Sequence, residues 1–493
     1  MALLWEGSEW TFQSIKESLD ACEEIGNKEL GMSLYPNQIE IISSEMMLDA
    51  YTSVGMPIYY NHWSFGKHFS QQSESYKKGY SGLAYELVIN SNPCINYLME
   101  DNSMTTQCLV LAHAGVGHNH FFKNNYMFRQ WTHADAIIDY LVFAKQYVAR
   151  AEEKHGRVNV ERFLDACHAL SDYGVNRYKR PAKLSMAKEQ ERQAEREAYL
   201  ESQVSELYRI LPEKKSAHKK EDSFPKEPEE NILYFCEKFS PTLKPWQREL
   251  IRIVRKIAQY FYPQGQTKVM NEGCASIVHY KIMNRLHEKG LISDGSHLEF
   301  LAMHSGVLYQ PPFNSEHYSG FNPYKLGFEI LRDIERICSE PTEEDAHWFP
   351  HLVGENGWEM CKEAIENYRD ESFIRQFLSP KLMRNFRMFH LHDNKQSSSY
   401  AVSSIHNEQG YQDIRETLAN QYERHYHVPH LEVIHVDKDS QRMTIQFKSE
   451  HRRKLEKSHA MMNHLRTLWG RDVRIVNEYG VNIFDEDINL SEY

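Results

Sequence analysis

The feature that most constrains this chain is an apolar segment that ends in histidines. Residues 109–125 read LVLAHAGVGHNHFFKNN, so His113, His118 and His120 follow a run of aliphatic side chains. A neutral imidazole nitrogen binds zinc, iron or copper without bringing a formal charge that must be desolvated. The segment therefore favours a partly buried metal site. The alternative interpretation is a buried helix whose histidines bond to neighbouring core groups.

A straight α-helix cannot supply two ligands from these histidines. His113 and His120 are seven residues apart, which corresponds to about 10.5 Å of rise, and His118 points about 140° away from His113. Ligand nitrogens must lie about 2.1 Å from a shared zinc ion. Gly115 and Gly117 tolerate backbone angles that other residues avoid. The sequence therefore predicts a bulged or unwound turn that moves His118 onto the face of His113.

The composition is that of a globular protein with room for two or three domains, since 41% of the 493 residues are hydrophobic and 12% are aromatic. A net charge of -12 and a pI near 6.1 argue against nucleic acid or an anionic membrane as the main partner. No apolar run approaches the roughly 20 residues of a membrane span, and no secretory signal is visible. We therefore expect a cytoplasmic protein that binds neither nucleic acid nor membrane.

The cysteines predict neither a disulfide framework nor a zinc ribbon. All eight are scattered along the chain, and no two form a Cys-x-x-Cys pair. We expect most of them to be reduced, small residues of the core.

The apolar periodicity predicts a mainly helical body that is interrupted by a charged segment. Residues 1–180 form its first half and contain the histidine motif. Residues 181–230 are rich in Lys, Glu, Arg and Gln and predict an exposed helix and a linker, because mixed charge favours a solvated face over an RNA-binding arm. Residues 231–378 form the second half, with helices predicted over 245–263 and 269–289.

The helix predicted over 269–289 supplies the second half of the metal site. Glu272 and His279 lie seven residues apart on a face of small and apolar side chains, about 10.5 Å apart along the axis. We therefore expect Glu272 to be the ligand and His279 to contact a ligand or the substrate. An ion pair between Glu272 and a neighbouring basic residue is the alternative.

From about residue 379 the pattern changes to alternation. It predicts strands at 400–406, 431–436, 443–447 and 473–476 and helices at 411–422 and 454–469. The order βαββαβ predicts a ferredoxin-like module over 379–493, so the fold class of the whole chain is α+β. No cluster of histidine, cysteine or carboxylate in this module has ligand spacing. We therefore expect it to bind a protein partner and no metal.

These motifs resemble the SpoVR family, named for stage V sporulation protein R. The resemblance rests on EMMLDAY at 45–51, VGMP at 54–57, HWSFGK at 62–67, GH at 117–118 before FFKNN at 121–125, and MNEG at 270–273 before HY at 279–280. It implies a cytoplasmic bacterial protein from a family that is linked in spore formers to cortex formation and is also present in bacteria that never sporulate. We expect a role in cortex formation or stress physiology. The partners that the resemblance implies are a serine protein kinase and a von Willebrand A-type protein.

Two positions depart from the family pattern. Cys274 stands where relatives usually have tryptophan, and His120 stands where many have aspartate. The second departure weakens His120 as a ligand and leaves His113, His118 and Glu272 as the better trio. His62, in the HWSFGK string, is a further candidate beside His120 and His279.

The Glu-Gly motif downstream of a histidine helix also looks like that of certain gluzincin peptidases, which makes the expected site zincin-like. In those enzymes a glutamate follows the first metal-binding histidine and acts as general base, whereas here that position is Ala114. Activation of water would need another carboxylate. Glu86 and Glu45 are the catalytic candidates.

The sequence leads to two main functional hypotheses and to a third that has less support. The first is a metal-dependent, hydrolase-like enzyme in which His113, His118 and Glu272 hold a divalent metal, with zinc favoured and iron or manganese as alternatives. The second is a noncatalytic regulatory or scaffold protein with a structural metal that acts with the kinase, which a closed four-ligand site would favour. The third is a carboxylate-rich di-iron site built from Glu45, Glu86 and Glu272 with the histidines, but the chain lacks the usual Glu-x-x-His pairs of such sites.

Overall fold

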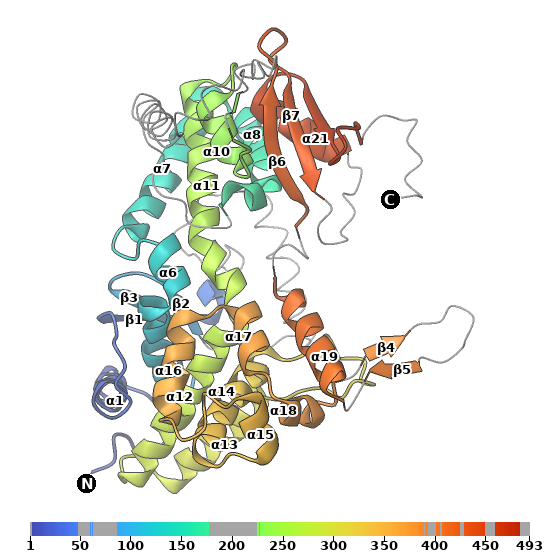
Figure 1. Cartoon of the computed structure of the whole chain (residues 1–493). Helices are drawn as coiled ribbons and strands as arrows, with labels where there is room; N and C mark the ends of the chain where they lie inside the picture. The colour runs from blue at the N-terminus through green and yellow to red at the C-terminus, as the bar shows by residue number, and fades with distance from the viewer. Residues whose placement is uncertain are drawn as a thin grey trace, which may run out of the picture. The chain divides into compact units, whose positions relative to one another are not determined.

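The computed structural model divides into two compact units (Figure 1). Unit 1 contains residues 1–162, 256–428 and 451–453, and unit 2 contains residues 163–255, 429–450 and 454–493. The structure describes residues 2–47, 60, 62, 86–176, 224–225, 227–388, 390–392, 401–404, 407–423, 428–448 and 459–483. Most of the predicted charged segment, 181–230, lies outside these residues. Each unit combines segments that are far apart in the sequence, whereas the predicted domains follow one another along the chain.

Unit 1 contains a small sheet in a region whose pattern predicted mainly helix. Strand β1 (Asn37–Ile42) pairs in parallel with β3 (Cys94–Met99), and β2 (Glu86–Ile89) pairs antiparallel with β3. The central strand, β3, buries five of its six side chains, at Cys94, Ile95, Asn96, Leu98 and Met99. A short apolar run reads alike as a buried strand or a buried helical segment, so periodicity did not identify this sheet.

The core of unit 1 is helical and surrounds α12 (Lys268–Glu288). This helix packs against α14 (Pro323–Ser339) and against a long broken helix that consists of α4 (Met104–Val110), η2 (Leu111–His118) and α5 (Asn119–Asn124). Helix α1 (Phe12–Glu24), which continues into η1 (Ile25–Glu29), also packs against η2. The helix predicted over 269–289 is thereby confirmed to within one residue at each end.

Further helices complete the described parts of both units. Unit 1 contains α6 (Tyr126–Trp131), α7 (Ile137–His155), α13 (Asp294–Val307), α15 (Glu343–Trp348), α16 (Gly357–Asn367), α17 (Asp370–Phe377), α18 (Pro380–Asn385) and α19 (Glu408–Gln421). Unit 2 contains η3 (Ser171–Gly174) and α10 (Ile232–Phe239), and the boundary between the units falls within α8 (Arg157–Ala169) and α11 (Pro245–Gln266). The prediction of a helix over 245–263 is confirmed, although α11 continues beyond Pro263.

The ferredoxin-like arrangement predicted for residues 379–493 is not confirmed in the described residues. Strand β5 (Ala401–Ser404) pairs with β4 (His390–His392) in a separate two-stranded sheet. Strands β6 (His430–Val436), β7 (Met443–Lys448) and β8 (Val473–Val476) form a three-stranded sheet in unit 2. Helix α19 buries Tyr411, Ile414 and Leu418 in the core of unit 1. Alternation located the strands, but it carries no information about which strands pair.

Unit 2 has a core of its own around the C-terminal sheet. Helix α21 (His459–Trp469) joins β7 to β8, and the ring of Trp469 stacks on Phe235 of α10 at a centroid distance of 5.6 Å. The Oγ of Ser240 donates a hydrogen bond to the backbone oxygen of Trp469 at 2.8 Å. The C-terminal sheet is therefore packed against the segment around residues 232–240 and does not form a unit alone.

Two further expectations bear on the class of the protein. All eight cysteines are free and buried, as predicted for small core residues. Within the described part of the chain, no helix combines the length and the apolar character that crossing a membrane requires.

Candidate metal centre

A π-helical turn brings His113 and His118 together. Residues Leu111–His118 form η2, in which backbone hydrogen bonds join residues five apart instead of four apart. Because the two histidines are themselves five residues apart, the wider turn places them next to each other, where an α-helix would direct them about 140° apart. Their ring centroids lie 4.7 Å apart. The distortion predicted for the segment around Gly115 and Gly117 is therefore confirmed.

Gly117 also allows η2 to approach α12 closely. A Cβ atom at position 117 would lie 2.6 Å from the Cα of Ala275, a distance at which the helices would have to move apart. A Cβ atom at Gly115 would lie 3.4 Å from Leu19, which is ordinary van der Waals contact. The helix crossing therefore requires glycine at position 117 and not at position 115.

A second pair of glycines brings α14 against α12. A Cβ atom at Gly273 would lie 2.5 Å from the carbonyl carbon of Gly327, and one at Gly327 would collide with the backbone oxygen of Val269. Positions 273 and 275 point about 200° apart on a helix. Helix α12 is therefore in close contact with η2 on one face and with α14 on the opposite face. Glu272 lies where these three helices meet.

Glu272 completes a cluster with the two histidines. Its Oε2 lies 3.7 Å from Nε2 of His113 and 3.6 Å from Nε2 of His118. The ligand atoms of the three residues all lie within 4.8 Å of one another. Two ligands that are each about 2.1 Å from one tetrahedral ion lie about 3.4 Å apart. The separations of Oε2 from both nitrogens therefore suit a shared metal ion.

The Oε2 atom of Glu272 is buried and accepts no hydrogen bond from a described residue. Among the described residues Glu272 pairs with the imidazoles of His113 and His118, and no pair with a lysine or arginine is found there. A buried carboxylate oxygen without a donor is unfavourable unless a cation binds it. The Glu272 side chain is 17% exposed and the two histidine side chains are 5% and 6% exposed, so the cluster is largely shielded from solvent.

Asn271 orients the ring of His118. Its Oδ1 lies 2.9 Å from Nδ1 of His118, and a carbonyl oxygen can only accept a hydrogen bond. The proton of the neutral imidazole is therefore on Nδ1, and the lone pair of Nε2 faces Glu272. A histidine that binds a metal usually has its second nitrogen bonded in this way.

A chain of buried histidines holds His113. Its Nδ1 lies 2.8 Å from Nδ1 of His279, and Nε2 of His279 lies 2.7 Å from Nδ1 of His304. His279 is completely buried. His279 therefore bonds to a member of the cluster without joining it, and its role beside a metal stays a prediction.

Burial sets the charge of the cluster. It lowers the pKa of His118 to about 4 and lowers the pKa of His279 well below its usual value. Burial alone would raise the pKa of Glu272, but interactions with the two clustered histidines and with Tyr324 outweigh it, so this pKa lies below its usual value. At neutral pH an ionised carboxylate therefore faces neutral imidazole, which is the protonation state that metal ligands need.

Asp370 of α17 anchors the end of α12 that carries Glu272. Its two carboxylate oxygens accept hydrogen bonds from the backbone N–H groups of Val269 and Met270, each at 2.9 Å. Burial raises the pKa of Asp370 to about 7, although the backbone hydrogen bonds oppose this shift. Asp370 thus helps to fix the first turn of α12, and no sequence pattern linked it to the site.

The other predicted site residues lie outside the cluster. His120 turns away, and its Nδ1 accepts a hydrogen bond from the backbone N–H of Ser33 at 3.1 Å. His62 is buried and Glu45 is exposed, and neither belongs to the cluster. Glu86 begins β2, but its side chain lies outside the described residues. The structure therefore brings the predicted trio together, and the catalytic roles of Glu45 and Glu86 stay predictions.

Three residues next to the cluster were missed by the sequence analysis, namely Asn271, His304 and Tyr324. Tyr324 donates a hydrogen bond to Glu272, and its ring stacks on His113 at a centroid distance of 6.2 Å. Asn271 lies inside the MNEG string, so its position beside the predicted ligand was an available signal. Tyr324 and His304 come from α14 and α13, and no spacing connects them to the motif.

Comparison with known proteins assigns the chain to a family. Residues 9–427 match the family described as SpoVR like protein, and residues 429–479 match the SpoVR-like C-terminal domain. The Escherichia coli (strain K12) protein described as uncharacterized protein YcgB is 50% identical over 476 residues, which covers 96% of this chain and 93% of that relative. No solved structure matches the chain. The resemblance seen in the motifs is confirmed: this chain belongs to the SpoVR family.

Proposed function

We propose that this protein is a metal-dependent, hydrolase-like enzyme whose metal is held by His113, His118 and Glu272. The observation that carries the proposal is the buried Oε2 of Glu272, which accepts no hydrogen bond from a described residue and faces an Nε2 atom of each histidine. Two imidazoles and one carboxylate form a ligand set that catalytic zinc sites use. Zinc is therefore favoured, and iron and manganese also accept these donors.

The residues around the trio fit a catalytic role. A divalent ion bound there would act as a Lewis acid toward a carbonyl or phosphoryl oxygen. Asn271 and His279 hold the two histidines in place, and the Tyr324 hydroxyl lies at the cluster, where it can hydrogen-bond an oxygen of a substrate. Three protein ligands leave a coordination position for a substrate, as catalysis requires. We place this activity in the bacterial cytoplasm, in cortex formation or stress physiology.

Metal analysis of purified variants tests the proposal. His118→Asn and His120→Asn are a matched pair, because each removes one buried imidazole from the same helix, two residues apart. We expect the wild type and His120→Asn to contain stoichiometric metal and His118→Asn and Glu272→Gln to lose it. Full metal content in both ligand variants would show that the trio does not bind the ion.

A noncatalytic scaffold with a structural metal is the second candidate. The observation in its favour is that the described residues of unit 2, including the region matched by the C-terminal family domain, contribute nothing to the cluster. That unit is then available to dock the serine protein kinase or the von Willebrand A-type protein. The structure of the zinc-loaded protein separates the two candidates, since a fourth protein ligand favours the scaffold and solvent at that position favours the enzyme.

The di-iron alternative has less support. It requires Glu45 beside the cluster, whereas Glu45 is exposed and lies outside it. Metal analysis also tests this alternative, because a di-iron site would contain about two iron ions per chain.

A further inference from the structure

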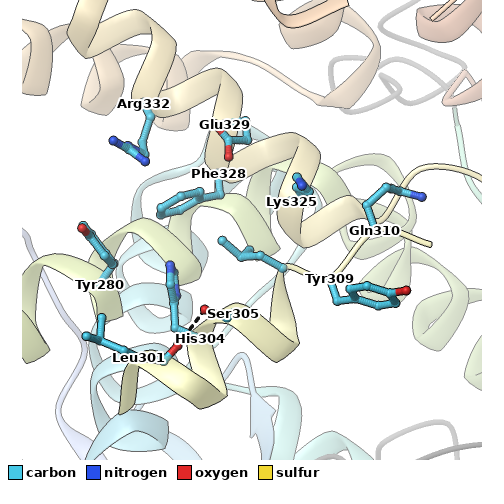
Figure 2. A pocket seen from close by; sticks show the side chains of 11 residues that line it. Tyr280, Leu301, His304, Ser305, Tyr309, Gln310, Lys325, Phe328, Glu329 and Arg332 are labelled. Atoms are coloured by element: carbon cyan, nitrogen blue, oxygen red, sulfur yellow. Dashed lines mark hydrogen bonds between the residues drawn. The ribbon is translucent and has the colours of Figure 1, made fainter. Parts of the chain in front are cut away.

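A pocket of about 590 Å³ lies among α12, α13 and α14 in unit 1. Figure 2 shows His304 rising from α13 toward Phe328 of α14, with Tyr280 of α12 beside it. Small-molecule sites in proteins have volumes of about 300 to 1,000 Å³. None of the three clustered ligands lines this pocket, so it is a site of its own.

Two basic side chains in the pocket have no acidic partner among the described residues. Lys325 and Arg332 are seven residues apart on α14, so they lie on the same face of the helix. Neither forms a salt bridge within the described part of the chain. Arg336, one turn further along α14, instead bonds to Asp333 and Asp345 at 2.7 Å each. The two pocket cations are therefore available to a ligand.

One acidic residue, Glu329, lies between these cations along α14 (Figure 2). It forms no salt bridge with either of them in the described structure. The pocket lining therefore retains an excess of positive charge. Guanidinium and ammonium groups that are not neutralised by the protein favour a ligand with a carboxylate or phosphate group.

His304 adds a hydrogen-bonding nitrogen to the same wall. Its Nδ1 is occupied by His279, and its Nε2 makes no hydrogen bond to a described residue. Its ring centroid lies 4.9 Å from that of Tyr280 and 5.1 Å from that of Phe328. Burial lowers the pKa of His304, and the positive charge of Arg332 lowers it further. The guanidinium of Arg332 therefore interacts electrostatically with the His304 ring. The pocket wall at His304 therefore combines the charge of Arg332, a ring nitrogen that can form a hydrogen bond, and the aromatic rings of Tyr280 and Phe328.

We propose that this pocket binds a small organic anion, in which a carboxylate or phosphate group is attached to an apolar part. Arg332 and Lys325 hold the anionic group, and Nε2 of His304 donates a hydrogen bond to one of its oxygens. The rings of Tyr280 and Phe328 pack against the apolar part. The site goes beyond the proposed metal centre and shares none of its three residues.

Calorimetric titration of the full-length, chelator-treated protein tests this proposal. Phenyl phosphate and benzoate are the two anionic probes, and benzyl alcohol is their uncharged counterpart. We expect equimolar binding of at least one anion and at least about tenfold weaker binding of benzyl alcohol, because a charge-assisted hydrogen bond is lost. The anion that binds identifies the chemical class. Binding of neither anion, or equal binding of benzyl alcohol, would overturn the proposal.

Charge-neutralising variants locate the bound anion. Lys325→Gln and Arg332→Gln should each weaken binding about tenfold, and Glu329→Gln should strengthen it, since it removes a repulsive charge. Lys281→Gln is the matched control, because Lys281 is already paired with Glu335 and does not line the pocket. Unchanged binding in both pocket variants, or an equal loss in Lys281→Gln, would contradict this site. His118→Asn should bind the anion normally, which separates this result from failure of the metal site.

Discussion

Nδ1 of His118 lies 2.9 Å from Oδ1 of Asn271, the residue that directly precedes Glu272. One residue of α12 therefore orients a histidine of η2, and the next residue of α12 faces the same histidine with its carboxylate. The relative positions of His118 and Glu272 are coupled through a single turn of helix. The geometry of the cluster is therefore a property of the contact between η2 and α12.

Removing the Asn271 acceptor should weaken metal binding without removing a ligand. We expect Asn271→Ala to lower the affinity for zinc about 10- to 100-fold, the usual effect of losing a hydrogen bond to a metal-binding histidine. Asn271→Asp keeps an acceptor at this position and should bind zinc close to normally. Competition with a chromogenic chelator measures both affinities. Equal affinity in Asn271→Ala and the wild type would show that this bond does not orient the ligand.

Two neighbouring glycines should respond differently to alanine. Gly117→Ala should lower the free energy of unfolding of unit 1 by about 1 to 3 kcal/mol, because the new methyl group overlaps the backbone of Ala275. Gly115→Ala, which meets only ordinary contacts, should change it by less than about 1 kcal/mol. Urea denaturation followed by near-ultraviolet circular dichroism compares them. Equal loss in both variants would mean that the close crossing is not the cause.

Metal should stabilise unit 1 through Glu272. Zinc at about 100 times its dissociation constant should add about 2.7 kcal/mol to the free energy of unfolding, because it binds the folded state alone. Glu272→Gln keeps the size of the side chain, loses its charge and should lose this gain. Calorimetry with zinc and after chelation measures the difference. A zinc effect of the same size in Glu272→Gln would rule out its carboxylate as a ligand.

His304 should make the stability of the metal-free protein depend on pH. Burial and then the charge of Arg332 lower its pKa to about 4 from an ordinary value of 6.5. Between these values the unfolded chain binds more protons, so the stabilising contribution is complete above about pH 6.5 and is lost as the pH falls through about 4. This contribution amounts to at most about 3 kcal/mol.

A comparison with His304→Asn isolates that contribution. The asparagine oxygen can still accept a hydrogen bond from His279, but the side chain does not titrate. Urea unfolding at about pH 7 and at about pH 4.5 should show a larger loss of stability in the wild type than in the variant. Parallel losses would assign the pH dependence to other groups.

The trio could be predicted because its members stand in short strings of unusual residue types. His113 and His118 are five residues apart, a spacing that an α-helix cannot use and a π-helical turn can, and Gly117 lies between them. The partners of the trio could not be predicted in the same way. His304 reaches His279 only because α13 packs beside α12, and nothing in the spacing of 279 and 304 records that packing.

The same distinction holds for the fold: features set by neighbouring residues could be predicted, and contacts between distant segments could not. The end of α12 could be predicted because Gly290, at a φ of 66°, stops the helix locally. The strand at 401–404 could also be predicted, but its partner is His390–His392, and α19 next to it packs into the helical core. Strand pairing depends on which surfaces remain after the helices pack, and a single sequence does not contain that choice.

When His113, His279 and His304 are all neutral, the hydrogen bonds between them can run in only two ways. Either the donors all point toward His304, or they all point toward His113. His279 carries one proton, so it accepts from one neighbour and donates to the other. A cation on Nε2 of His113 requires the proton of that ring on Nδ1, and the following bonds then leave an N–H on Nε2 of His304 that faces the pocket. An anion in the pocket selects the same direction. The two proposals together therefore predict that metal and anion favour each other's binding by the same factor, through the tautomers of the three rings.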